Sequence, residues 1–373
     1  MVFNPPLIVV TALFFLALVS ALYVGGWLFT SALLRLTRSR FSPAGNKRLL
    51  LSALVLPPIL AAIPTFGGAT LRHSHAREEL EHHSMACREM FASLFAGSNS
   101  LGVNATASSV LGALVNGLAW LLVGVGIFYV VRLVHATLHL ERGLAPYLIA
   151  PSPKLRQSLV RVGRQLPALR SGHFHECAIP AGYSSVLGLR RVRCVLSRDF
   201  VAAATDDELD AVVAHEACHI RAHDVWATLL VGALNCVFFP LRPVRLLARR
   251  WREEAEIACD DAAVRATRRP LAMASAILRA SGEPVSLGAK PALPAVVMPF
   301  ADEAACAPEK RVTRLLAQAK TASLPAATES RAQVWGGWLV TSAFAVLGFF
   351  LLHSAQVVCF AHCSLEAVAR LLP

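Results

Sequence analysis

Two histidines and a glutamate near the middle of the chain have the spacing of a metal site. In the segment His215-Glu216-Ala217-Cys218-His219 the imidazoles are four residues apart, which places them one turn apart on one face of a helix. Two imidazoles in this position can bind one metal ion, and the pattern is typical of zinc. A bound Zn²⁺ acidifies a water molecule, and Glu216 can take the released proton as a general base. The pattern therefore predicts metal-assisted hydrolysis.

A third protein ligand is expected, because catalytic zinc sites combine three protein ligands with one open position. The acidic stretch that begins at Arg252 offers Glu253, Glu256 and Asp260. Glu256 and Asp260 are four residues apart and share a helix face. One of them can bind the metal while the other accepts a hydrogen bond from a liganding histidine. Spacing alone does not choose among the three carboxylates.

Two weaker interpretations of these residues have to be weighed. The two histidines and Glu216 could be ordinary polar residues of a helix, but the segment around them is apolar, where unpaired polar groups are costly. His223 lies four residues beyond His219 and could be a further ligand. The metzincin pattern would instead require a glycine and then a histidine six residues past the second histidine. We therefore assign His223 a surface or supporting role.

Local signals predict the elements that position the motif. Thr205 can cap the amide of Glu208, and the Glu208 side chain can reach back, which is the capping box of a helix start. The motif should therefore lie on a helix from about Asp206 into the 220s. Upstream, residues 192–196 are rich in β-branched side chains and predict a short strand. We also hypothesise that this strand is a sheet edge to which an extended substrate peptide adds.

The composition is that of a membrane protein. Of the 373 residues, 55% are hydrophobic and only 16% are charged, whereas soluble domains carry about 25% charged residues. Segments 7–34, 49–66, 110–131 and 334–360 have about the length and apolar content of bilayer spans. The shorter apolar run 226–240 predicts a membrane-associated helix. The net charge of +12 arises from basic residues that flank these spans, which favours membrane topology over nucleic-acid binding.

The placement of Lys and Arg predicts the topology. The loop between the first two spans is basic and has no acidic residue, so it should be cytoplasmic, while loop 67–109 is mixed in sign and should lie outside. Residues 132–333 are Arg-rich and long enough for one compact cytoplasmic domain, which would contain the membrane-associated helix. The expected organisation is an N-terminal membrane region (1–131), this domain, a fourth span (334–360) and a short outer tail (361–373) in the cytoplasmic membrane, with both termini outside.

Together these features resemble the BlaR/MecR-type membrane metallopeptidases, the antirepressor family of β-lactam sensing. The Glu-x-x-Cys-Asp element is the most specific feature, and the resemblance extends to about Phe360. In chain order the matching segments are Gly188-Leu189-Arg190-Arg191, Asp207-Glu208-Leu209, residues 214–224 around the histidine pair, Phe238-Phe239-Pro240, Glu256-Ile257-Ala258-Cys259-Asp260 and Arg311-Val312-Thr313-Arg314-Leu315-Leu316.

The resemblance implies a multi-pass α-helical membrane protein with a gluzincin-type zinc peptidase domain, mainly α (α+β), that carries a small β-sheet. It implies zinc bound by His215, His219 and Glu256, with Glu216 as catalytic base and with Asp260 and Asp224 supporting the ligands from a second layer. The β-lactam receptors continue past their last span into a penicillin-binding domain, whereas this sequence ends at Pro373. Antibiotic sensing through such a domain is therefore not expected.

The expected function is signal-controlled cleavage of a cytoplasmic regulator, such as a BlaI/MecI-like repressor, or of the protein itself. The expected partners are membrane lipid, a protein substrate and a second copy in a homodimer, with no direct binding of nucleic acid. Two alternatives stay open: an HtpX/CAAX-type quality-control or processing protease, and a non-catalytic membrane signalling protein with structural zinc. Glu216 argues against the second alternative, because a purely structural zinc site needs no base.

Overall fold

A computed structural model of the chain describes residues 5–36, 42–70, 105–166, 169, 171–177, 184–188, 191–282, 298–299, 308–320, 342 and 346. The chain divides into two compact units, each assembled from segments that are separate in sequence. One unit comprises residues 1–36, 52–127 and 336–373. The other, here called the central unit, comprises residues 37–51 and 128–335 and contains the histidine motif.

Three long helices cover the first three apolar segments. They are α1 (Pro5–Leu36), α2 (Pro43–Thr70) and α4 (Ala105–Leu144), so the predicted helices are confirmed as helices, and α4 continues well past residue 131. Within the described residues, Phe15–Leu36 and Leu121–Tyr147 are long and apolar enough to cross a membrane, by length and composition. The four-span topology stays a prediction. Apart from residues 342 and 346, segment 334–360 lies outside the described residues, as does most of loop 67–109.

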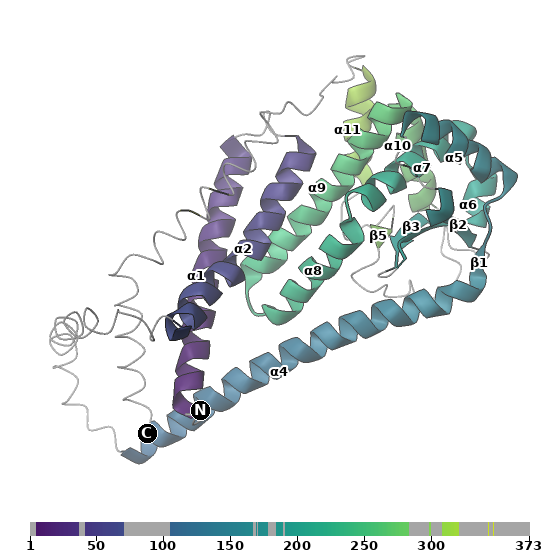
Figure 1. Cartoon of the computed structure of the whole chain (residues 1–373). Coiled ribbons are helices and arrows are strands. Elements are labelled where there is room, and N and C mark those ends of the chain that lie inside the picture. Colours follow the sequence, from purple (N-terminus) through teal and green to yellow (C-terminus); the bar gives the residue numbers. More distant parts are fainter. Residues whose placement is uncertain are drawn as a thin grey trace. The chain divides into compact units, whose positions relative to one another are not determined.

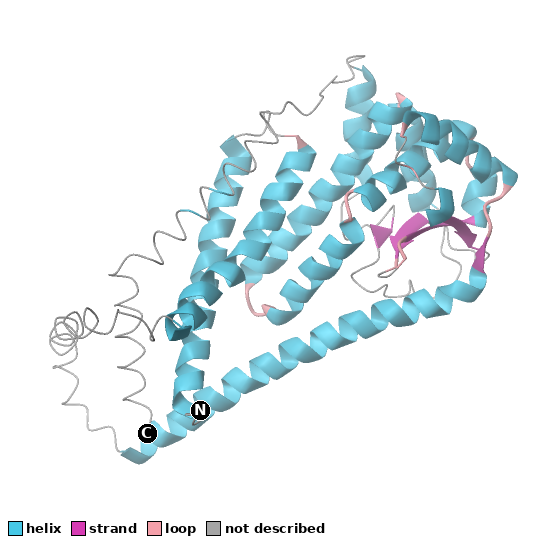
Figure 2. Cartoon of the chain, viewed as in Figure 1, coloured by secondary structure: helices cyan, strands magenta, loops and turns pink. Residues whose placement is uncertain are grey.

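The central unit combines several helices with a small sheet (Figures 1 and 2). Its helices are α5 (Pro153–Gln165), α6 (Arg198–Ala203), α7 (Asp206–Arg221), α8 (Asp224–Val237), α9 (Arg242–Thr267), α10 (Pro270–Gly282) and α11 (Pro308–Lys320). Its strands are β1 (Leu148–Ile149), β2 (Phe174–Cys177), β3 (Ser184–Leu187), β4 (Arg193–Ser197) and β5 (Met298–Pro299). The predicted membrane-associated segment 226–240 is largely helix α8, and its membrane contact stays a prediction.

The sheet is mixed, with strand order β1-β2-β4-β3-β5. Strand β4 pairs in parallel with β2 and antiparallel with β3, so the strand predicted at residues 192–196 is confirmed. Its predicted place at the edge of the sheet is wrong. Val195 lies opposite His175 on one side and Ser185 on the other, so neighbouring strands occupy both sides of β4 and no peptide can add to it.

The helix that carries the motif is packed on several sides. Helix α7 contacts α5, α9 and α10, as Figure 1 shows for the central unit. Its residues Leu209, Val212 and Val213 are fully buried and form the i, i+3, i+4 stripe of an amphipathic helix. The predicted capping box is confirmed: the amide of Glu208 donates to Thr205 Oγ1 at 3.2 Å, and the Thr205 amide donates to Glu208 Oε2 at 2.8 Å.

Two buried carboxylates fix the first turns of α7 to the neighbouring helices. Glu208 accepts hydrogen bonds from Ser275 and Arg279 of α10, which together with the cap lower the pKa of Glu208 even though burial opposes this. On the other side, Asp210 accepts from Ser158 Oγ at 2.6 Å and from two nitrogens of Arg161, each at 2.8 Å, on α5. These contacts set the rotation of α7 and so the direction in which its histidines point.

Candidate metal centre

Three predicted ligands meet in the interior of the central unit. The Nε2 atoms of His215 and His219 are 3.1 Å apart, and the two oxygens of Glu256 lie 3.6 Å and 3.5 Å from them. All three residues are buried, with exposed fractions of 2% or less. Glu256 comes from α9, while Glu253 points to a different contact, an ion pair with Arg249 on the same helix. The structure thus selects Glu256 among the carboxylates that spacing left open.

The spacing of these atoms fits a bound metal ion. Ligand atoms at about 2.05 Å from a tetrahedral metal are separated from one another by about 3.3 Å. The observed separations of 3.1, 3.5 and 3.6 Å bracket that value. Two imidazole nitrogens this close either share a proton or share a cation. A divalent ion between the three side chains satisfies both nitrogens and the Glu256 carboxylate together.

The opposite ring nitrogens of both histidines face carboxylates. Nδ1 of His215 lies 3.0 Å from Asp260 Oδ1, and Nδ1 of His219 lies 2.8 Å from Asp224 Oδ2. A carboxylate accepts the proton that Nδ1 carries, so it fixes the tautomer in which the Nε2 lone pair is available to a metal. The structure therefore places Asp260 and Asp224 against the Nδ1 atoms of the two histidines, and their supporting role beside a metal stays a prediction.

A buried arginine from α11 links two of these carboxylates. Arg311 donates to Asp260 through Nε at 2.8 Å and Nη2 at 2.6 Å, and its Nη1 lies 2.9 Å from Glu256 Oε2. Burial raises the pKa of Asp260, but the guanidinium overcomes this and holds it well below its usual range. In the metal-free site, hydrogen bonds to Asp260 and Glu256 outweigh burial and raise the pKa of His215 to about 10.

A lysine from α2 contacts the other second-layer carboxylate. Lys47 Nζ donates to Asp224 Oδ1 and lies 5.9 Å from the centre of the Trp251 ring. Sequence reasoning gave neither Lys47 nor Arg311 a role at the site. Lys47 served only as a topology signal, and Arg311 only as part of a family-like segment. The sequence offered one signal for them: carboxylates predicted to lie in the protein interior require cationic partners.

Glu216, the predicted base, is fully buried on α7 beside the first histidine. Burial, and to a lesser degree the charge of Glu216, raise the pKa of the Cys194 thiol on β4. A second combination of potential ligands exists around His219 Nδ1, where Cys259 Sγ lies 3.4 Å away. Asp224, its third member, is already paired with Lys47. The group built on the two Nε2 atoms is therefore the better metal site.

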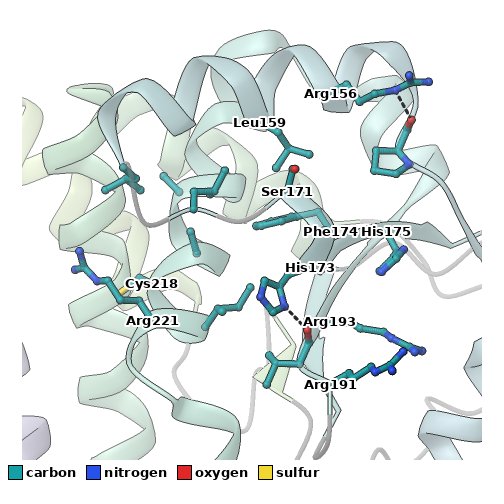
Figure 3. A pocket seen from close by; sticks show the side chains of 18 of the residues that line it. Arg156, Leu159, Ser171, His173, Phe174, His175, Arg191, Arg193, Cys218 and Arg221 are labelled. Carbon is teal, nitrogen blue, oxygen red and sulfur yellow. Dashed lines mark hydrogen bonds between the residues drawn. The ribbon is translucent and has the colours of Figure 1, made fainter.

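A large cavity of about 1650 Å³ lies on the other face of α7 (Figure 3). Figure 3 shows Cys218 and Arg221 on one side of it and Arg191 and Arg193 on the other. His173 lies between them, with its Nδ1 2.6 Å from the Val192 carbonyl oxygen. None of the three metal-group residues lines this cavity, whereas the exposed His223 does. The cavity lining therefore differs from the metal group, and His223 belongs to the cavity lining.

Comparison with known proteins identifies a similar segment in other chains. Residues 182–297 match the model of a family described as BlaR1 peptidase M56. The Plastoglobule-localized metallopeptidase 48, chloroplastic, of Arabidopsis thaliana is 28% identical over 118 residues. That alignment covers 30% of this chain and 34% of the relative, so the chain spans about a third of the relative's length. The matched segment holds the histidine pair, Glu216, Glu256 and Asp260. Residues 182–297 are therefore similar to the BlaR1-type M56 peptidases, and both comparisons support a metallopeptidase.

Proposed function

We propose that this protein is a multi-pass membrane endopeptidase that uses zinc bound by His215, His219 and Glu256. The observation that carries the proposal is the buried arrangement in which both Nε2 atoms face Glu256 while both Nδ1 atoms face carboxylates. A helix that only packed two histidines into a core would not need a carboxylate on both sides of each ring. The arrangement supports a centre built to hold a cation.

The donor set and the charge balance favour zinc. Two imidazole nitrogens and one carboxylate oxygen form the ligand set that catalytic zinc sites of peptidases use. Among the described residues, three buried carboxylates near the histidines, Asp224, Glu256 and Asp260, contact two cationic side chains, Lys47 and Arg311. A divalent cation compensates this excess of negative charge.

In the proposed mechanism, some side chains bind the metal and another transfers protons. Zinc, when bound, polarises the scissile carbonyl and lowers the pKa of a water molecule. The two histidines and Glu256 fix its position, and their second-layer carboxylates keep each ring in one tautomer. The Glu216 carboxylate accepts the proton of the attacking water and then delivers it to the amine that leaves, which balances the hydrolysis of one peptide bond.

The test compares Glu216→Gln with Glu253→Gln in the full chain. Glu216→Gln should keep zinc and lose about 10²- to 10⁴-fold in kcat, the contribution typical of a general base. Glu253 pairs with Arg249 on α9, away from the metal group, so Glu253→Gln makes the same chemical change outside the site and should keep activity. Zinc content by elemental analysis and cleavage of a quenched-fluorescence peptide measure the two properties. Undiminished cleavage by Glu216→Gln would refute the enzymatic proposal.

For the biological role we favour regulated cleavage of a cytoplasmic regulator, such as a BlaI/MecI-like repressor, or self-cleavage. The match to the BlaR1-type peptidase family supports this role. The alternative of membrane-protein processing stays open, because the partial similarity to a plastoglobule-localized metallopeptidase concerns the peptidase and names no regulatory substrate. A comparison of proteins cleaved in cells that express wild type or Glu216→Gln separates the two. Enrichment of membrane proteins among the substrates, with no regulator, would favour processing.

A further inference from the structure

One contact of the metal centre comes from a helix far from the matched peptidase segment. Helix α2 begins in the central unit, and its residue Lys47 reaches Asp224, which is 177 residues later in the chain. The neighbouring Asn46 donates through Nδ2 to Glu254 Oε2 of α9 at 3.3 Å. The ammonium group of Lys47 also lies near the ring of Trp251 on α9, which is fully buried. The first turns of α2 are thus anchored on α8 and α9.

The Lys47 contact continues directly to a predicted ligand. One oxygen of Asp224 accepts a hydrogen bond from the Lys47 ammonium, and the other lies 2.8 Å from Nδ1 of His219. Asp224 is completely buried, and only 13% of the Lys47 side chain is exposed. Both oxygens of this carboxylate are therefore occupied, so its rotation is fixed by the lysine. The lysine in turn fixes the ring of His219.

We propose that Lys47 is a positioning residue of the metal centre, which sets the affinity for the metal through Asp224 and His219. The inference rests on the proposed zinc site. Without the lysine, one oxygen of a buried carboxylate loses its charged partner, and the carboxylate can turn away from His219. Second-layer partners of a metal-binding histidine typically change metal affinity or activity 10- to 100-fold. Lys47 is one contact further out, so we expect a loss near the lower limit, about tenfold.

The consequence concerns helix α2 as a whole. From Lys47 the helix continues to Thr70 and includes the predicted span 49–66. The lysine that orients His219 therefore belongs to the same helix as that span, and the metal centre depends on a residue outside the matched segment 182–297. A comparison limited to the matched segment contains Asp224 but lacks its charged partner.

The experiment measures the Zn²⁺ dissociation constant of the purified full chain by chelator competition. Lys47→Met should weaken Zn²⁺ binding about tenfold, and Lys47→Arg, which keeps a cationic donor, should lose less. Lys320→Met is the matched control, because Lys320 is exposed at the end of α11. Near-UV circular dichroism of each variant reports whether the packed core is kept. Zn²⁺ binding by Lys47→Met at wild-type affinity would overturn the proposal.

A double-mutant cycle separates positioning from a general structural role. Asp224→Asn removes the buried charge, so Lys47→Met should add little in that background if the lysine acts through Asp224. If the double variant loses Zn²⁺ affinity by the product of the two single losses, the residues act independently. That result would overturn the proposal even if both single variants bind Zn²⁺ weakly. Glu216→Gln keeps the test distinct from the proposed function. Zn²⁺ retained with activity lost in that variant supports catalysis by Glu216, whereas the Lys47 result depends on metal affinity alone.

Discussion

Replacement of Arg311 by methionine tests whether the metal centre is built as a buried charge network. Met removes the guanidinium but keeps an unbranched apolar side chain of similar reach. The change removes two hydrogen bonds from Asp260, those donated by Nε and Nη2, and it removes the contact between Glu256 and Nη1. The exposed side-chain fractions are 1% for Arg311, 3% for Glu256 and 2% for Asp260, so water cannot take over the role of the arginine.

The magnitude follows from this burial. Removing one partner of a buried ion pair typically costs about 3 to 5 kcal/mol, because the remaining charge stays buried without compensation. Arg314 offers the comparison on the same helix, with a bidentate pair to Asp261 at 2.6 and 2.7 Å. Its side chain is 34% exposed, so water screens the pair and its loss should cost at most about 1 kcal/mol. The two substitutions are chemically identical and differ mainly in burial.

The assay is denaturant unfolding of the chelator-treated full chain in detergent, monitored by tryptophan fluorescence. Trp251 is fully buried in the central unit and should report its unfolding. Arg311→Met should lower the free energy of unfolding by several kcal/mol, and Arg314→Met by at most about 1 kcal/mol. A combination of Arg311→Met with Asp260→Asn should recover part of the loss, because it removes one uncompensated charge. Equal effects of Arg311→Met and Arg314→Met would refute the reasoning.

Three further predictions follow from particular residues. Metal binding at pH 7 should release at least one proton, because the pKa of His215, raised to about 10 in the metal-free site, keeps the imidazole protonated at pH 7. Metal affinity should therefore fall as pH falls, and calorimetry in buffers of different ionisation enthalpy counts the protons released. Gly188→Ala should lower the free energy of unfolding by about 1 to 3 kcal/mol, because the φ of Gly188 is +105° and a Cβ would lie 2.2 Å from the Arg191 carbonyl oxygen. Gly172 has open space around it, so Gly172→Ala should leave thermal unfolding nearly unchanged. Thr205→Ala should lower the free energy of unfolding by about 1 kcal/mol, because it removes the cap of α7. Thr205→Ser retains a hydroxyl and should keep most of that stability in the same measurement.

Local periodicity was sufficient to predict the part of the site that lies on single helices. The four-residue spacing of His215 and His219 fixed their common face, and the capping box at Thr205 fixed the start of α7 within one residue. The same spacing placed Glu256 and Asp260 on one face of α9. It could not decide which carboxylate faces the Nε2 atoms of both histidines. That choice depends on how α9 packs against α7, a tertiary contact that helix periodicity does not contain.

The position of a strand within the sheet was beyond reach for a related reason. The β-branched residues of segment 192–196 indicate a strand that is well packed, but they do not state how many strands pair with it. The partner β2 lies before β4 in the chain and pairs in parallel, while β3 pairs antiparallel. A proline at Val195 would therefore disrupt strand pairing inside the sheet. Beyond β4, the sheet continues with β3 and then β5.

The cations of the metal centre show where local patterns stop being informative. Arg311 lies 51 residues beyond Asp260, and Lys47 lies 177 residues before Asp224. Both are outside the matched segment 182–297, which nevertheless contains every carboxylate that they neutralise. Buried carboxylates without cationic partners are unstable, so a fragment limited to the matched residues would carry the ligands without the charges that hold them. The functional unit must therefore include the first turns of α2 and helix α11.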